Sequence, residues 1–300
     1  MINYKLFKDN GFNIKSIKKI NTAYIVSDNN QKYVIKENKN DLKSIFDYLS
    51  SRNFSNFPNY SKLEGYDVFD YIEDTDISTE ERLIEAINLL IMLHLKTTRY
   101  KNIDIDDYKK IYEELLGRVE YLNNYYITIN DSIDNEIYMS PSHYLLVKNI
   151  SKVYGALSFC KNELNSWYEL IKNSSKQRAV LVHNNLDLSH VLYNKVPYLI
   201  SWNNSKIDLP IYDLVSLYNK YYNSIDFSIL LNNYMHKYPL SNEELKLFFI
   251  MISVPIKIEF TNNEYDNVKL VKDVISYINK GDELIRAYYS SEKKKIVSNK

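Results

Sequence analysis

The residues best suited to chemistry lie in one polar stretch, residues 183–190, which follows the apolar run 180–182. Ser201 follows a second apolar run, and Lys36 ends a strand-like run much earlier in the chain. Phosphoryl transfer needs a lysine that holds phosphates, a carboxylate that positions or deprotonates the acceptor hydroxyl, and side chains that bind magnesium. Lys36, at the end of a strand-like run, is therefore a candidate for the lysine that holds phosphates in such a site.

Asn185, His190 and Ser201 carry no carboxylate that could position a hydroxyl or bind magnesium. Asn185 has nearly the shape of aspartate but carries no negative charge, so it cannot accept a proton from a hydroxyl. Ser201 offers one neutral oxygen, and His190 offers nitrogen where magnesium prefers oxygen. Loss of even one preorganised electrostatic group can cost roughly 100- to 1,000-fold in rate. We therefore expect no intact catalytic residue, no metal site and negligible turnover.

Other side chains offer little compensation for these losses. Asp187 lies two residues beyond Asn185, and we do not expect it to serve as the carboxylate that positions the acceptor hydroxyl. The turn at residues 21–23 contains no glycine that would let backbone amides approach a phosphate. The helix expected after Lys36 offers only Asp41 or Asp47 as a carboxylate partner, and neither is clearly placed. We expect no cofactor, although metal-independent nucleotide binding stays open.

The remaining reactive side chains are expected to have structural roles. His183 and His190 lie seven residues apart without a third well-placed ligand, which favours a loop anchor plus a surface residue over a transition-metal site. His94 lies on the apolar face of its predicted helix and is expected in the core. Cys160 is the only cysteine, so an intrachain disulfide is excluded and a buried, unreactive thiol is expected.

Short strands and one helix are predicted to position Lys36. Alternating apolar residues and a polar turn indicate a meander of three strands, followed by a helix and another strand. The predicted strands are residues 16–20, 23–27, 32–36 and 66–72, and the predicted helix is 41–52. This β-rich block ends near residue 74.

From residue 75 the pattern becomes mainly helical. Capping boxes at residues 78–81 and 241–244 each predict a helix start, because their serine and glutamate satisfy free backbone amides. Helical periodicity covers residues 106–126 and 142–172 and resumes at residue 212. A β-rich segment at residues 179–202 contains the polar stretch 183–190, which we call the candidate loop.

Composition excludes some classes of partner. The chain has 300 residues, of which 45% are hydrophobic, and its 38 basic and 38 acidic residues give no net charge. A neutral chain offers no overall electrostatic attraction to nucleic acid or to anionic membranes. The residues at the start of the sequence and its short apolar runs lead us to expect neither a signal peptide nor a membrane span. We expect cytoplasmic synthesis, with neither nucleic acid nor membrane as a partner.

The candidate loop resembles that of the aminoglycoside phosphotransferase and choline kinase superfamily. The family loop reads His-Gly-Asp, four residues, Asn, then an apolar strand and Ile-Asp-Trp or Ile-Asp-Phe. His183 matches the loop histidine, whereas Asn185, His190 and Ser201 stand where the family has its catalytic aspartate and its two metal ligands. The resemblance implies that the loop keeps the spacing of the family motif but lacks its catalytic and metal-binding side chains.

The resemblance also implies a fold and further site residues. The fold is a protein-kinase-like, bilobal α+β fold, with a small antiparallel β N-lobe at residues 1–74 and a large, mainly helical C-lobe at residues 75–300. Lys36 would contact nucleotide phosphates, and Asp213 would be a buried structural aspartate at a helix start. The residues that would form a hinge beside adenine are Asp70, Tyr71 and Ile72.

Within the superfamily, the chain is most similar to the CotS-type spore coat proteins. Residues 19–36, the hinge-like 69–73 and the late helix opening at 238–245 carry this similarity. It implies sporulation, a place in the spore coat, other coat proteins as partners, and a structural or interaction role as a pseudokinase. An ATP- and magnesium-dependent small-molecule phosphotransferase with unusual catalytic residues is the alternative. A regulatory module that binds nucleotide lies between them, and self-association stays open.

Overall fold

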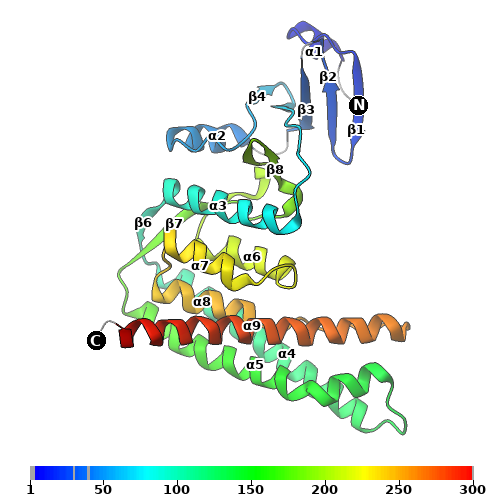
Figure 1. Ribbon diagram of the computed structural model, residues 1–300, viewed down its shortest axis with the longest axis vertical. Helices are drawn as coiled ribbons and strands as arrows, with labels where there is room; N and C mark the ends of the chain where they lie inside the picture. The colour runs from blue at the N-terminus through cyan, green and yellow to red at the C-terminus, as the bar shows by residue number, and fades with distance from the viewer. Residues whose placement is uncertain (1–3, 30, 39–40, 299–300) are drawn as a thin grey trace. The chain divides into compact units, whose positions relative to one another are not determined.

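The computed structural model describes residues 4–29, 31–38 and 41–298. The chain forms two compact units (Figure 1). Unit 1 comprises Met1–Thr98 and Val180–Ile207, and unit 2 comprises Arg99–Ala179 and Asp208–Lys300. The predicted lobe boundary at residue 74 lies within unit 1, and the division of the chain into lobes stays a prediction.

Unit 1 is built on a five-stranded antiparallel sheet of order β1-β2-β3-β5-β4. One face of the sheet packs on the short helix α1 (Tyr4–Asp9), where Val26, Ile35 and Val68 are buried against Phe7. The strands are β1 (Ser16–Ile20), β2 (Ala23–Ser27), β3 (Lys32–Glu37), β4 (Tyr60–Leu63) and β5 (Tyr66–Asp70). The predicted meander is confirmed, whereas α1 and β4 were not predicted.

Two longer helices follow α1 in unit 1. Helix α2 (Leu42–Ser51) buries Leu42, Phe46 and Leu49, which lie on one face at helical spacing. Helix α3 (Thr79–Thr97) begins at the predicted capping box, in which Ser78 and Glu81 bond reciprocally. Helix α3 thus starts where the sequence provides side chains that satisfy its free amides.

The segment 180–207 returns to unit 1 and contains the candidate loop. The backbone amide of Leu199 donates to the carbonyl of Asn56 at 2.8 Å, and Arg82 donates to the carbonyl of Val191 at 2.6 Å. These bonds fix the loop beside the amino-terminal part of the unit. The elements in or entering this segment are β7 (Lys176–Val182), η1 (Leu188–His190), β8 (Val191–Asn194), β9 (Val196–Leu199), η2 (Trp202–Asn204) and β10 (Lys206–Asp208).

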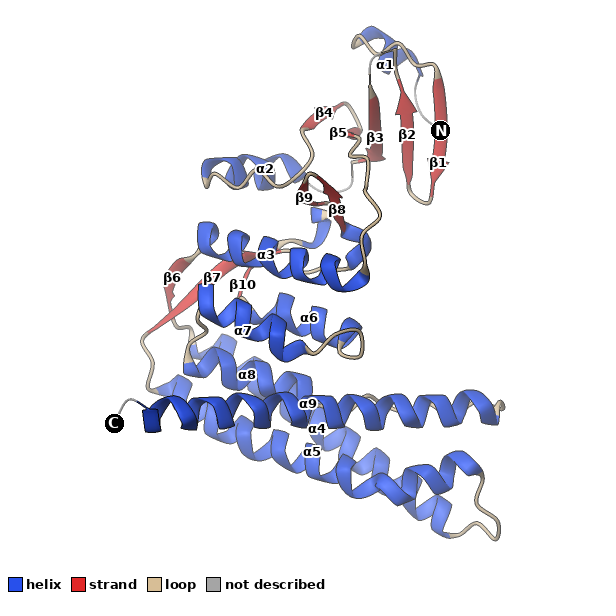
Figure 2. Cartoon of the chain, viewed as in Figure 1, coloured by secondary structure: helices blue, strands red, loops and turns tan. Residues whose placement is uncertain are grey.

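Unit 2 is mainly helical. Figure 2 shows the long hairpin of α4 and α5 with α9 beside it. The strand β6 (Arg99–Asn102), which was not predicted, pairs antiparallel with the first residues of β7. The helices are α4 (Ile105–Asp134), α5 (Pro141–Lys172), α6 (Ile211–Tyr221), α7 (Phe227–Lys237), α8 (Asn242–Ser253) and α9 (Glu264–Ser298). Within the described ranges, none of the helices combines the length and the apolar character needed to cross a membrane.

Candidate functional site

A cavity of about 330 Å³ in unit 1 contains most of the predicted site residues. Lys36, Ser201 and the predicted hinge, Asp70 to Ile72, line it. Its other walls are largely apolar, and this size is typical of small-molecule sites. We call it the apolar cavity; its other lining residues are Ile20, Ile25, Val34, Leu42, Pro58, Phe69, Asp74, Leu192, Ile200, Trp202 and Asn203.

A second cavity of about 460 Å³ shares part of this lining. Lys36, Ser201 and Asn203 border both cavities. The second one is lined mostly by amides, hydroxyls and lysines, and we call it the polar cavity. Its other lining residues are Lys19, Asn21, Thr22, Tyr24, Glu37, Asn185 and Asn204. Sequence analysis did not name Lys19, because an exposed strand-end lysine has no distinguishing pattern.

Lys36 stands at the end of β3, where the two cavities meet. Burial lowers the pKa of Lys36, and the negative charge of Asp67 partly offsets this effect. Its ammonium also lies 6.0 Å from the ring centre of Phe69. The carboxylate that acts on Lys36 is therefore Asp67, directly opposite on β5, and not Asp41 or Asp47.

Asp67 is only 1% exposed and is held by neutral donors. The hydroxyl of Tyr60 donates to it at 2.9 Å, and the side-chain amide of Asn38 donates at 3.1 Å. Burial raises the pKa of Asp67, while the bond from Tyr60 and the charges of Lys62 and Lys36 act against this rise. Asp67 thus provides a fixed negative charge beside Lys36, on the neighbouring strand of the sheet.

Ser201 has an unusual backbone conformation. Its φ of 68° and ψ of 48° lie in the left-handed region, which residues with a side chain seldom adopt. Both Ser201 and Trp202 were included in the predicted β-rich segment, but β9 ends at Leu199 and Trp202 begins η2. The buried indole of Trp202 donates to the carbonyl of Leu199 at 3.0 Å. This turn places Ser201 on the wall of both cavities.

The two loop histidines bond to backbone carbonyls. His183 is fully buried, its Nε2 donates to the carbonyl of Ile200 at 2.8 Å, and its ring packs edge-on against Trp202. His183 therefore anchors the residue before Ser201, as a loop anchor would. His190 bonds through Nδ1 to the carbonyl of Asn185 at 2.7 Å and lines neither cavity.

The side chains of the polar cavity do not fit magnesium. This ion prefers octahedral oxygen ligands that include carboxylates, whereas Glu37 is the single carboxylate among the described residues lining this cavity. Asp187 instead caps η1, accepting from the amide of Ser189 at 3.0 Å and its hydroxyl at 2.7 Å. Asp208 accepts from the amide of Leu209. Across the described chain, histidine, cysteine, aspartate and glutamate form no group of three that could hold a metal ion.

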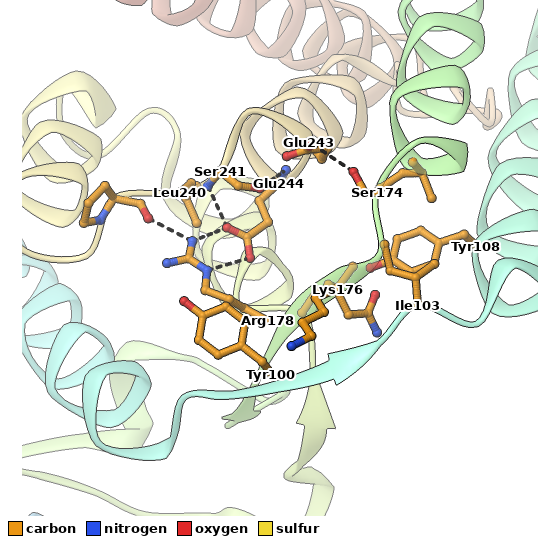
Figure 3. A pocket seen from close by; sticks show the side chains of 14 residues that line it. Tyr100, Ile103, Tyr108, Ser174, Lys176, Arg178, Leu240, Ser241, Glu243 and Glu244 are labelled. Carbon is orange, nitrogen blue, oxygen red and sulfur yellow. Dashed lines mark hydrogen bonds and ion pairs between the residues drawn. The ribbon is translucent and has the colours of Figure 1, made fainter.

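Unit 2 contains a further predicted residue and a separate cavity. Asp213 is fully buried in the first turn of α6. A cavity of about 300 Å³ has an ion pair between the partly buried Arg178 and the buried Glu244 in its wall (Figure 3). None of the predicted site residues lines this cavity. Cys160 is also buried in unit 2, and burial raises the pKa of its thiol to about 12.

Comparisons with known proteins establish the fold. No protein-family model matches the chain, and no curated protein matches its sequence. An aminoglycoside phosphotransferase from Alicyclobacillus acidocaldarius is similar over 98% of this chain and 97% of its own, with a TM-score of 0.73 and 9% identity. The AMP-bound spectinomycin phosphotransferase APH(9)-Ia is similar over 90% of this chain and 94% of its own, with a TM-score of 0.53 and 14% identity.

A glucosamine kinase in complex with glucosamine, ADP and inorganic phosphate is similar over 94% of this chain and 82% of its own, with a TM-score of 0.50 and 8% identity. Likeness at such low identity establishes the fold alone. The chain therefore has the predicted protein-kinase-like α+β fold of the aminoglycoside phosphotransferases, with an antiparallel sheet in its amino-terminal part and a mainly helical remainder.

Proposed function

We propose that this protein is a pseudokinase, which uses the phosphotransferase fold to bind partners and not to transfer phosphate. The observation that carries the proposal is the side-chain content of the polar cavity. Lys36 and Ser201 line this cavity together with Asn185, and its single carboxylate is Glu37 at the end of β3. A neutral amide cannot accept the proton of a hydroxyl nucleophile, and these side chains do not fit magnesium.

Contacts in the loop around these residues support the view that the shape of the cavity is maintained. His183 holds the carbonyl of Ile200, and the left-handed turn at Ser201 follows directly. A left-handed conformation at a residue with a side chain costs free energy and persists only where the surroundings enforce it. The loop thus keeps its geometry, although Asn185 and Ser201 stand where the family has carboxylates. This combination is expected for a fold that serves a binding role.

An exposed apolar tip supports interaction with other proteins. Ile137 and Tyr138 are 90% and 91% exposed in the loop between α4 and α5, and Met139 is partly exposed beside them. We call these three residues the apolar tip. Large exposed apolar side chains are typical of interaction sites. The resemblance to CotS-type proteins supports the spore coat as the location and other coat proteins as the partners.

The base of the apolar tip is fixed by polar contacts. Glu136 pairs with His143 at 2.9 Å, and Glu264 accepts from the amide and hydroxyl of Ser142 at 2.6 and 3.0 Å. A fixed loop loses less conformational entropy on binding than a mobile one. Because Asp131, Asp134 and Glu136 flank the tip in the sequence, the partner surface that fits best is an apolar pocket with a basic rim.

A phosphotransfer assay tests the proposal. Purified protein is incubated with radiolabelled ATP, magnesium or manganese, and pooled aminoglycoside, amino-sugar and choline acceptors. We expect no product that depends on both acceptor and protein, while an active aminoglycoside phosphotransferase serves as the positive control. Acceptor-dependent product that disappears in a Lys36→Met variant would overturn the proposal.

The second candidate is an ATP-dependent small-molecule phosphotransferase. It is favoured by the likeness in fold to an aminoglycoside phosphotransferase and a glucosamine kinase. In this reading Lys36 holds the phosphates of ATP–magnesium and unusual residues replace the missing carboxylates. A ligand that binds only the folded state raises the melting temperature, so stabilisation by ATP that requires magnesium distinguishes this candidate from the pseudokinase.

A further inference from the structure

The cavity of unit 2, with Arg178 and Glu244 in its wall, takes no part in the proposed function. We call it the unit 2 cavity. All of its lining residues belong to unit 2, and its volume of about 300 Å³ is at the lower end of the range for small-molecule sites. The start of α4, the end of α5, the strands β6 and β7 and the start of α8 contribute to the lining (Figure 3).

Two opposite charges line the unit 2 cavity without pairing with each other. Lys176 on β7 provides an ammonium group, and Glu243 in the first turn of α8 provides a carboxylate. Within the described part of the chain, Lys176 has no ion-pair partner, and Glu243 accepts from the neutral hydroxyl of Ser174 at 3.3 Å. The other two charges in the lining, those of Arg178 and Glu244, already pair. A ligand that carries both an anion and a cation would complement the two remaining charges.

The side chain of Gln177 offers a further polar contact in the same wall. Its amide oxygen is buried and makes no hydrogen bond within the described residues, which is costly for a buried acceptor. Gln177 lines the cavity between Lys176 and Arg178 on β7. The terminal bond of a glutamine side chain has a broad torsional preference, so a rotation can turn the amide oxygen toward the cavity. An ammonium group of a ligand is a suitable donor to this oxygen.

Most of the remaining lining is apolar and suits a hydrocarbon side chain. Tyr108, Ile171, Leu209 and Leu240 all line the cavity and are buried. Contact with these side chains would remove apolar surface of the ligand from water, which stabilises the bound state. The cavity therefore combines a partner for an anion, two acceptors for a cation, and an apolar wall.

We propose that the unit 2 cavity binds a free α-amino acid with an apolar side chain, such as leucine or phenylalanine. Lys176 binds the α-carboxylate, Glu243 and the amide oxygen of Gln177 bind the α-ammonium group, and the apolar wall contacts the side chain. None of the residues that line this cavity borders the apolar cavity or the polar cavity. The proposal therefore does not depend on whether the fold transfers phosphate.

Isothermal titration calorimetry of the full chain with a matched series of ligands tests the proposal. We expect L-phenylalanine and L-leucine to bind, whereas phenethylamine, hydrocinnamate and glycine should each bind about tenfold or more weakly than L-phenylalanine. Phenethylamine lacks the carboxylate, hydrocinnamate lacks the ammonium group, and glycine lacks the apolar side chain. The first two compounds also represent the ends of a peptide chain, each of which carries a single charge.

Two variants assign each end of the ligand to one wall of the cavity. Lys176→Gln should weaken the binding of phenylalanine and hydrocinnamate by about tenfold and leave that of phenethylamine unchanged. Glu243→Gln should weaken the binding of phenylalanine and phenethylamine and leave that of hydrocinnamate unchanged. Lys101→Gln is the control for the lysine, because Lys101 is exposed on the neighbouring strand β6 and does not line the cavity. Glu80→Gln is the control for the glutamate, because Glu80 has the same place in the capping box of α3.

The variant Gln177→Met separates a binding role of the amide from a structural role. Methionine has a similar length but no amide, so the variant should raise the melting temperature by removing a buried acceptor without a partner. The same variant should weaken the binding of phenylalanine. A lower melting temperature together with unchanged binding would overturn the assignment of Gln177 as a ligand contact.

The proposal as a whole would be overturned by the absence of heat with phenylalanine and leucine at millimolar concentration. Binding of phenethylamine or hydrocinnamate as tight as that of phenylalanine would also overturn it, as would equal affinities in the Lys176 and Glu243 variants and their controls. Circular dichroism verifies that each variant is folded. These outcomes leave the pseudokinase proposal intact, because that proposal depends on the phosphotransfer assay, and phosphotransfer activity would in turn leave the unit 2 cavity unaffected.

Discussion

Lys36 is subject to two opposing influences in the folded chain. Burial lowers its pKa below the ordinary 10.5, and the charge of Asp67 raises it. Between the lowered pKa and 10.5 the unfolded chain binds more protons than the folded chain, so the contribution of Lys36 to stability rises with pH through that window. Anion binding has the opposite dependence, because it needs the ammonium form and should weaken as pH rises through the lowered pKa.

Removal of the negative charge of Asp67 tests this balance. In Asp67→Asn the influence that raises the pKa of Lys36 is lost, so we expect the pKa of Lys36 to fall further. Titration of ¹³C-dimethylated lysines by NMR measures the value, with Lys36→Arg used to assign the signal. Asp41→Asn is the control, because Asp41 pairs with Lys62 and does not shift the pKa of Lys36. An unchanged or higher pKa in Asp67→Asn would contradict the assignment of Asp67 as the partner.

The side chains that could form the site were easier to predict from the sequence than the side chains that support them. The end of a predicted strand and the loop pattern were enough to name Lys36, His183 and Ser201. Asp67 was missed because its pairing with Lys36 requires β3 to lie beside β5, although a helix and β4 separate the two strands in the chain. Such a pairing depends on tertiary packing, which local periodicity does not contain.

At the scale of the element, the turn at Ser201 has a strained backbone conformation and also lines both cavities. Glycine adopts the left-handed region without the steric cost that a side chain adds, roughly 1–2 kcal/mol. We therefore expect Ser201→Gly to raise the free energy of unfolding relative to Ser205→Gly by about 1 kcal/mol. Ser205 is the control because its φ is −65°. Urea denaturation measures both variants, and a Ser201→Gly variant that is no more stable than Ser205→Gly would show that the turn carries no strain.

The start of α8 depends on a partly buried ion pair. Arg178 donates to Glu244 through two nitrogens and to the carbonyl of Pro239, and Glu244 also caps α8 through the amide of Ser241 (Figure 3). Burial works against the charge of Arg178, but the bond and charge of Glu244 more than compensate and raise its pKa. The pair thus connects β7 to the helix start within unit 2.

Removal of one partner of this ion pair should lower the free energy of unfolding. In Arg178→Met the buried carboxylate of Glu244 loses its partner, so we expect a loss of about 3–5 kcal/mol in the free energy of unfolding. Lys172→Met is the control, because its pair with Glu169 is exposed and such pairs contribute about 1 kcal/mol or less. Denaturation in guanidinium chloride measures both. A loss in Arg178→Met no larger than in the control would show that the carboxylate is well solvated without arginine.

Among the elements, those with strong local signals were predicted and short strands were missed. Both capping boxes start helices, at Thr79 and Asn242, because their side chains satisfy the free amides locally. The strands β4 and β6, each of four residues, lack a run of alternating apolar residues and form by pairing with β5 and β7. Their existence follows from a partner strand and not from their own residue pattern.

At the scale of the whole molecule, the resemblance predicted the fold class, and the structure groups segments that lie far apart in the chain. Residues 180–207 belong to the same compact unit as residues 1–98, although helices α4 and α5 separate them in the chain. The aromatic side chain of Trp202 packs against Phe46 and Phe54. Contacts at such sequence separation are determined by the complete core, which no window of the sequence reveals.

The apolar tip tests whether the fold serves an interaction role. A triple variant, Ile137→Ser, Tyr138→Ser and Met139→Ser, should keep the melting temperature, because exposed side chains contribute little to stability. It should be lost from coat material when spores of a host that expresses it are fractionated and probed by immunoblot. The control, Tyr100→Ser, changes an exposed tyrosine elsewhere in unit 2 and should be retained. Retention of the triple variant at the wild-type level would mean that the tip does not hold the protein in the coat.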